Sequence, residues 1–354
     1  MKRQSGFSLV ELMVAITLAL LLTGAVISVF VGSRSAYEST AGVGDMSDSG
    51  RMALNLIGES VRSAGSLACN SAMTATSQSL VVNPNQFDRF FGQGVAGFEA
   101  NGTTPPAAIA QPAVPVVGAT NNWTPNLDPT VTGANPGQPV RGSDVLVLRS
   151  SVPRITPTYT TVDVAPGTAA LTVTPTLFAV AGNAYAAVSD CTKSVIFQVP
   201  VAVALGATAV TLNAGVPVGF SAGALVTPLT TTIYYIGVGS DGDSSLFRLE
   251  QVNGGPGFNA AEELVPDIEN MQVLYGIDPT GTQTAAAYVP ANQVAVGTNV
   301  VSIQVALLVA SPAAGKQVPA AAPYNLLGTQ VTVPADNRSR QVFYATLNLR
   351  NAVN

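Results

Sequence analysis

The chain has 354 residues, which is ample for a sizeable core, and it is 47% hydrophobic but only 10% charged. It contains no histidine, which excludes Ser-His-Asp and Cys-His catalysis as well as histidine-based metal sites. Its 2 cysteines are too few for a thiolate zinc site, and the net charge of −5 gives no reason to expect a nucleic-acid partner.

The N-terminus joins a short basic leader to a long apolar run. Lys2 and Arg3 come first, residues 6–11 read Gly-Phe-Ser-Leu-Val-Glu, and residues 12–32 carry no charge. The apolar run is long enough to cross about 30 Å of hydrocarbon as a helix. Because basic residues before such a run favour a cytoplasmic N-terminus, we expect one membrane pass with the rest of the chain in the periplasm.

Glu11 is the unusual residue of this segment, because a carboxylate at the edge of an apolar run is costly unless it has a partner. One interpretation is an interfacial side chain that reaches water. The string from Gly6 to Glu11 favours another, since it resembles the type III signal of type IV prepilins. The resemblance implies that a membrane peptidase cuts between Gly6 and Phe7 and methylates Phe7. It also implies that Glu11 pairs with the N-terminal amine of a neighbouring subunit.

This pairing would make Glu11 a registry device. A carboxylate and an ammonium are each costly alone in lipid, and they compensate each other only when two subunits assemble in register.

Two other export signals fit less well. A secretory signal peptide needs an Ala-x-Ala-like cleavage site after the apolar run, and residues 29–33 do not provide one. A lipoprotein signal would have to use Cys69, which lies far beyond the run and has Ser66 where a leucine is expected.

The helix is expected to continue beyond the membrane. Residues 33–65 contain no proline, and their apolar residues fall on one helical face that can pack on a head domain. These residues are Met46, Ala53, Ile57, Val61 and Ala64. We therefore expect a leader at 1–6, a membrane-spanning half of the helix at 7–32 and a periplasmic half at 33–65. Glycines within the helix, such as Gly50, are expected to weaken it, and Gly65 suits its C-terminal stop.

Short β patterns dominate from residue 66 onward, so the fold class is α+β, with an antiparallel, β-rich head at 66–354. Gly and Asp residues at 239–245 separate two of the strands and predict a hairpin. The predicted strands are residues 144–149, 194–199, 231–238, 246–252, 271–277, 300–310 and 341–349.

Residues 101–140 interrupt this pattern. They contain 8 prolines with many Gly, Asn and Thr, which predicts a long surface excursion rather than an ordered layer. The single tryptophan, Trp123, is expected to hold this loop against the head.

Several head segments, taken in order, resemble the PilW family of minor pilins. They are residues 64–69, 142–149, 190–191, 195–199, 269–278, 301–309 and 340–351. The resemblance implies a type IV pilin-like fold and a minor subunit of the inner membrane, with the major pilin, other minor pilins and the prepilin peptidase as partners. Membrane lipid and a tip adhesin are further candidate partners, and no cofactor is implied.

Cys69 and Cys191 are predicted to form one disulfide, because an even, sparse cysteine count in an exported protein favours pairing in the oxidising periplasm. The alternative is two separate buried thiols.

No motif in the head indicates catalysis, and we expect no enzyme activity and no metal site. Asp241-Gly242-Asp243 could suggest calcium, but an EF-hand loop starting there would need an acid at Val252, so a turn is favoured. An acidic cluster, which is expected to mark a solvated face, comprises Glu262, Glu263, Asp267 and Glu269.

Two functions follow from these features. The first is a minor pilin that initiates or caps a type IV pilus and so supports twitching motility. The second is a minor pseudopilin of a type II secretion system. A periplasmic sensor or scaffold on a single anchor is a third possibility. The occurrence of Glu11 next to a prepilin-type cleavage string disfavours it.

Overall fold

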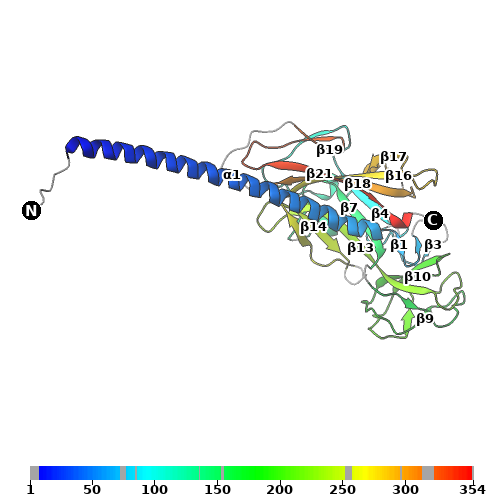
Figure 1. Ribbon diagram of the computed structural model, residues 1–354. Coiled ribbons are helices and arrows are strands. Elements are labelled where there is room, and N and C mark those ends of the chain that lie inside the picture. The colour runs from blue at the N-terminus through cyan, green and yellow to red at the C-terminus, as the bar shows by residue number, and fades with distance from the viewer. Residues whose placement is uncertain are drawn as a thin grey trace, which may run out of the picture.

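The computed structural model describes residues 8–71, 77–83, 86–134, 136–152, 155–251, 257–295, 297–312 and 323–352. One long helix, α1 (Leu9–Ser63), projects from a β-rich head (Figure 1). The fold is therefore α+β and pilin-like, as the sequence predicts.

Local sequence sets both ends of α1. Ser8 caps the N-terminus, where its Oγ accepts from the Val10 backbone N–H and the Glu11 side chain accepts from the Ser8 N–H, so two otherwise unpaired donors are satisfied. At the other end Gly65 has φ +78°, which glycine adopts without penalty. The helix runs without interruption for 55 residues despite its internal glycines.

The larger sheet has ten strands, and its main path follows the order β3-β11-β10-β13-β7-β4-β6. Neighbours on this path are antiparallel except for β11 with β3. The bounds are β3 (Ser77–Ser79), β4 (Val95–Ala100), β6 (Trp123–Thr124), β7 (Val145–Ser151), β10 (Ala184–Ser189), β11 (Ser194–Val199) and β13 (Leu225–Val238).

Three more strands join this sheet through β13. β14 (Ser244–Glu250) forms a hairpin with β13, as expected, and pairs in turn with β15 (Glu262–Pro266). β8 (Thr158–Tyr159) pairs with the start of β13.

The smaller sheet has four antiparallel strands in the order β17-β16-β18-β21. Their bounds are β16 (Ile268–Ile277), β17 (Ala287–Pro290), β18 (Val300–Ala310) and β21 (Arg340–Asn348). The predicted bounds of β11 and β18 are those observed. The other predicted strands are found with shifted ends, and β13 begins earlier than its apolar pattern suggests.

Short elements complete the head. Three small sheets are formed by β1 (Ser66–Leu67) with β2 (Asn70–Ser71), by β9 (Ala170–Thr172) with β12 (Ala209–Thr211), and by β19 (Tyr324–Leu326), β20 (Thr329–Thr332) and β5 (Ala108–Ala110). Among the described residues, the other helical turns are η1 (Thr120–Asn122), α2 (Pro129–Thr132), η3 (Ala291–Gln293) and η4 (Arg350–Ala352).

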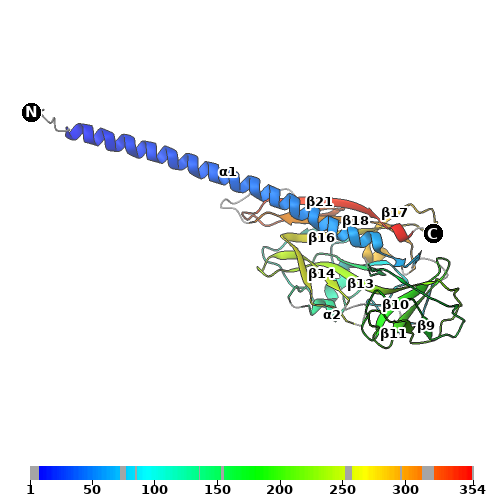
Figure 2. The ribbon, with the colours of Figure 1, turned by 60° about the horizontal axis from the view of Figure 1, so that its bottom comes forward.

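The main core lies where α1 meets the two sheets (Figure 2). Ile57, Val61, Tyr234, Met271 and Ile303 are among its buried residues. A separate core fills the lobe around β9 and β10, at the end of the head away from the N-terminus (Figure 1).

The segment at 101–140 is more ordered than its proline content predicts. It contributes β5, η1, β6 and α2, and Trp123, Leu127 and Val131 are buried in a core with strands of the large sheet. Trp123 packs its own loop as expected, and its indole N–H donates to the Ser143 carbonyl at 2.8 Å. The prolines lie in turns between these buried residues. Composition alone does not distinguish such a packed segment from an exposed loop.

Candidate functional site

The periplasmic half of α1 is docked on the head through the predicted apolar stripe. Met46 is 3% exposed, and Ala53, Ile57, Val61 and Ala64 are fully buried. Spacings of seven, four, four and three residues place these side chains on one face, so the sequence pattern alone was sufficient to identify the docking surface.

Glycines bring this face close to the C-terminal strand β21. A Cβ built on Gly50 would lie 2.5 Å from Cδ2 of Phe343, and one on Gly58 would lie 3.3 Å from Cδ2 of Leu347. A Cβ on Gly42 would meet Ser311 at 3.3 Å. The sequence predicts that glycines weaken the helix, whereas these three also leave room for side chains of β21 and of the turn that follows β18.

Hydrogen bonds lock the C-terminal end of α1 to the head. The Gly65 N–H donates to the Arg149 carbonyl at 2.8 Å, and the Asn351 amide donates to the carbonyls of Ser63 and Ala64 at 3.3 Å each. Ser60 and Tyr234 share a hydroxyl hydrogen bond of 2.8 Å. The end of α1 is thus held by the last residues of the chain and by the large sheet.

Arg149 supports this junction from inside. The residue is 3% exposed, and its guanidinium donates to the carbonyls of Phe87 and Gln93. Burial lowers the pKa of Arg149 to about 10, an effect that the nearby Asp88 carboxylate partly opposes.

Cys69 and Cys191 form a disulfide that ties the same junction to the far lobe. Their Cα atoms are 4.8 Å apart although 122 positions separate them in sequence. Cys69 lies in the turn between β1 and β2. Cys191 lies in the turn between β10 and β11.

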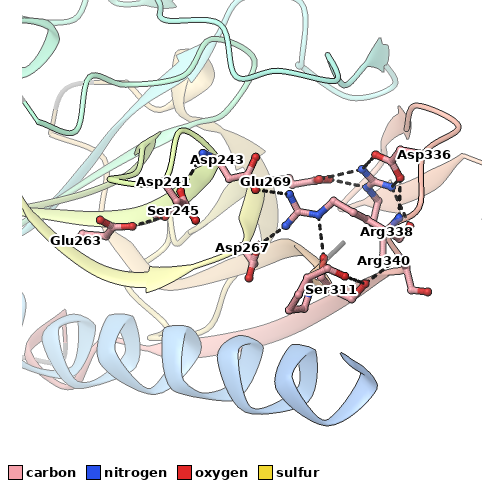
Figure 3. A network of polar contacts seen from close by, with 12 residues as sticks. Asp241, Asp243, Ser245, Glu263, Asp267, Glu269, Ser311, Asp336, Arg338 and Arg340 are labelled. Atoms are coloured by element: carbon pink, nitrogen blue, oxygen red, sulfur yellow. Dashed lines mark hydrogen bonds and ion pairs between the residues drawn. The ribbon is translucent and has the colours of Figure 1, made fainter. Parts of the chain in front are cut away.

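Two arginines before and within β21 organise a polar network beside α1 (Figure 3). Arg338 contacts Asp243 at 2.8 Å and also pairs with Asp267, while Arg340 contacts Glu269 at 2.7 Å and Asp336 at 2.6 Å. The Arg340 side chain is only 3% exposed. The network joins the β13–β14 turn and the start of β16 to the C-terminal strand.

The prediction that the acidic cluster marks a solvated face is wrong for Asp267 and Glu269, whereas the Glu262 side chain is 57% exposed. Glu269 is 9% exposed and bonded to Arg340, and Asp267 is bonded to Arg338. Glu262 pairs with Arg248, and Glu263 accepts from the Ser245 hydroxyl at 2.7 Å. The arginines that neutralise Asp267 and Glu269 are distant in sequence, so a local charge pattern could not reveal them.

The segment at 239–245 is a turn. The Gly239 N–H donates to the Asp243 carbonyl at 2.7 Å, the Asp243 N–H donates to Oδ1 of Asp241 at 2.9 Å, and Gly242 has φ +89°. Among the residues that the structure describes, no group of three or more acidic or cysteine side chains is arranged to hold a metal ion.

A buried pair of carboxyls, Glu99 and Asp144, sits between the two sheets. Asp144 accepts from the backbone N–H groups of Ala100 and Val273, each at 2.9 Å, and Glu99 accepts from the Ala291 N–H at 3.2 Å. Burial raises the pKa of both carboxyls, and the neighbouring Glu99 raises that of Asp144 further.

The N-terminal half of α1 differs from the docked half, because it stands clear of the head (Figure 1). It is long and apolar enough to cross a membrane by length and composition, and its window of highest hydropathy has no residue buried against the head. Glu11 lies in its first turn, and Leu18, Leu22 and Phe30 are among the exposed side chains.

Two family models match the chain. The prokaryotic N-terminal methylation motif matches residues 1–27, and the family described as Type IV Pilus-assembly protein W matches residues 233–351. In these two segments the chain is similar to PilW-family pilins with a prepilin-type N-terminus. Neither a curated protein nor a solved structure matches it.

The PilW match corresponds to one part of the head. It runs from within β13 to η4 and so contains the whole small sheet on which α1 docks. The segments before residue 233 that resembled the family in sequence lie outside the match.

The predicted site residues lie at opposite ends of α1. Gly6 and Phe7 fall outside the described residues, Glu11 is at the N-terminal end, and Cys69 and Cys191 lie beyond the C-terminal end. The arrangement presents an apolar rod with one carboxylate near its start, held by a head that fixes its direction. Such a rod can pack laterally against similar helices.

Proposed function

We propose that this pilin is a minor subunit that helps to initiate or cap a type IV pilus. The observation that carries the proposal is the division of α1 into an exposed apolar half that begins with Glu11 and a half fixed rigidly to the head. A subunit stored in the inner membrane by the first half can enter a filament through the same apolar surface.

Processing prepares this surface. We propose cleavage between Gly6 and Phe7 and methylation of Phe7, which fits the match to the methylation motif at residues 1–27. The new amine would lie next to Ser8, the N-cap of α1. In an assembly, Glu11 would exchange its local bond to the Ser8 N–H for the amine of a neighbouring subunit.

The orientation follows from the charges of the leader. With Lys2 and Arg3 on the cytoplasmic side, the head and its disulfide lie in the periplasm, where thiols are oxidised. The partners are then the prepilin peptidase, the major pilin and other minor pilins, with a tip adhesin as a further candidate.

The head favours an end position over a repeating one. It carries a second lobe with its own core beyond the sheet that receives α1. An initiating or capping subunit need not match this lobe to another copy, whereas every subunit along a fibre must do so.

The test is a deletion complemented by wild type, by Glu11→Ala and by Glu38→Ala. Glu38 is also on α1 and is paired with Arg34, so it controls for loss of a helix carboxylate. We expect the deletion to lose surface pili and twitching, with wild type and Glu38→Ala restoring both and Glu11→Ala restoring neither while still inserting in the membrane.

Two outcomes would overturn the proposal. Normal pili with blocked secretion of folded proteins would assign the chain to a type II secretion system, and normal behaviour in both assays would leave only an anchored scaffold. Mass spectrometry of the mature N-terminus is an independent check, because a protein that begins at Met1 contradicts the processing step.

A further inference from the structure

The C-terminal strand β21 is an unusually open edge. It has 9 residues and forms one border of the small sheet, and every residue from Gln341 to Asn348 is at least partly exposed. Its neighbour β18 is buried along almost its whole length. Among the described residues, β21 pairs with β18 and with no other strand. Long exposed edges of this kind offer a row of unpaired backbone groups to another chain.

The other edges of the two main sheets are protected. β3 and β6 have 3 and 2 residues, and β17 has 4 and ends at Pro290. β15 has 5 residues, carries Glu262 and Glu263, and pairs through an irregular register. Short length, charge, proline and bulges are the usual devices against edge pairing. β21 has none of them from Gln341 to Asn348.

The register identifies which groups face outward. The Leu349 N–H donates to the Val301 carbonyl and the Ser311 N–H donates to the Ser339 carbonyl, which places the odd-numbered residues in the hydrogen-bonded pairs with β18. Because antiparallel partners alternate, the backbone groups of Val342, Tyr344, Thr346 and Asn348 turn toward the open edge.

The open edge runs alongside the assembly helix and in the same direction. Along α1, Gly42, Gly50 and Gly58 meet Ser311, Phe343 and Leu347 in turn, and Ser311 is bonded to Ser339 just before β21. Figure 2 shows β21 beside α1 over this stretch. The edge therefore lies on the flank where a neighbouring subunit aligned with α1 would stand.

This direction restricts the partner. Two copies that paired through β21 in the antiparallel sense would be related by a two-fold axis across the strands, so their α1 helices would point in opposite directions. Both helices could not then enter one membrane from the same side. An antiparallel strand of a different subunit has no such conflict, and antiparallel pairs outnumber parallel ones two- to three-fold.

We propose that β21 is a docking edge for an extended, uncharged strand of another pilin-type subunit, which runs antiparallel to it and extends the small sheet. Backbone hydrogen bonds would supply the attraction, and the exposed side chains Tyr344, Thr346 and Asn348 would select the partner. The inference rests on the proposed assembly function and names its contact.

The test is photo-crosslinking in cells that express the full chain. A benzoylphenylalanine replaces Tyr344, which is 55% exposed on β21, or Tyr159, which is 45% exposed on β8 in the far part of the head. We expect position 344 to give an adduct with another pilin-type subunit, identified by mass spectrometry, and position 159 to give none with that partner. No adduct at 344, or an adduct with a second copy of this chain, would overturn the proposal.

A proline variant tests the backbone directly. Thr346→Pro removes an outward N–H and leaves the ladder to β18 intact, so we expect a melting temperature within a few degrees of wild type and about a tenfold weaker adduct from position 344. Ala345→Pro removes an inward N–H and should lower the melting temperature instead. Thr346→Lys gives a second measurement without altering the backbone. An undiminished adduct in both position-346 variants contradicts edge pairing.

These measurements separate the edge from the proposed function. The adduct is scored whether or not pili form. Normal piliation in the deletion with an adduct at position 344 would remove the pilus role and keep the contact. Pilus loss in the deletion without an adduct would keep the role and remove the contact.

Discussion

Glu99 and Asp144 link the stability of the head to pH. Their pKa values are raised in the folded state by burial and, for Asp144, by its carboxyl neighbour. A raised pKa means that folding favours the protonated form, so this stabilisation is complete below the ordinary carboxyl pKa and is lost as pH rises through the raised values. We expect Glu99→Gln to flatten the fall in the free energy of unfolding between pH 4 and pH 8. Each pKa unit between the folded and unfolded states corresponds to about 1.4 kcal/mol.

Thermal melts of wild type and variant across this pH range measure the effect. Asp45→Asn removes the same charge from an exposed position on α1 and should leave the slope as in wild type. Parallel curves for wild type and Glu99→Gln would show that Glu99 does not contribute to the pH dependence of stability.

Arg340 is the most buried arginine of the network in Figure 3 and pairs with two carboxylates. Its side chain is 3% exposed and faces Glu269 and Asp336, which are 11% and 27% exposed. Removing one partner of a buried ion pair leaves uncompensated charge and costs about 3–5 kcal/mol. We therefore expect Arg340→Ala to lower the free energy of unfolding by about that amount, as measured by urea denaturation.

Arg248 provides the matched comparison. It pairs with Glu262 at 2.6 Å, but the two side chains are 33% and 57% exposed. Exposed pairs contribute about 0–1 kcal/mol, so Arg248→Ala should have a small effect. Equal losses in the two variants would mean that burial does not determine the contribution of these ion pairs.

At the scale of the element, α1 contains glycines of opposite character. Gly50 lies under the Phe343 ring, where an added methyl group would clash, whereas a Cβ at Gly44 would meet nothing within 4 Å. We expect Gly44→Ala to stabilise the protein by about 0.5–1 kcal/mol through helix propensity. Gly50→Ala should destabilise it by about 1–3 kcal/mol because the helix must move away from β21.

Chemical denaturation of the two single variants decides this point. If Gly50→Ala also stabilises, α1 can shift on the sheet without cost, and the close approach to β21 is not a constraint. Both positions lie in the same stretch of α1, so the two variants share the effect of helix propensity and differ in packing against β21.

The sequence predicts elements well where one period persists. The stripe from Met46 to Ala64 and the runs that form β11 and β18 were found with little error, because burial of one face or of a whole strand leaves a clear pattern. β3, β6 and β9 were missed, because two or three residues carry no period. Such strands form only because the surrounding chain brings them to a partner.

At the scale of the whole molecule, the sequence predicts candidate site residues but not the residues that surround them in the fold. The leader string and Glu11 are local signals that need no fold. Three features depend on contacts between segments that are distant in sequence. They are the ion pairs of Arg340, the position of Glu99 and Asp144 between the two sheets, and the open edge of β21. A single sequence specifies these pairings only through the complete fold.

The disulfide is the longest-range covalent constraint in the head. It joins the turn after α1 to the β10–β11 turn over 122 positions, so it links the helix junction to the lobe with a separate core. Chain-entropy arguments give about 4–5 kcal/mol for closing a loop of this size, and native disulfides of exported domains typically contribute about 2–5 kcal/mol.

We therefore expect Cys69→Ser with Cys191→Ser to lower the free energy of unfolding by about 2–5 kcal/mol, with the lobe around β10 becoming sensitive to protease before the docked half of α1. Reductant should shift the melt of wild type to that of the double variant and leave the variant unchanged. The shift should be specific to the bond, because both serines preserve the size of the side chains. Thiol labelling of the denatured, unreduced wild type is the direct measurement, and two labelled cysteines would contradict the bridge and with it the covalent link between the helix junction and the lobe.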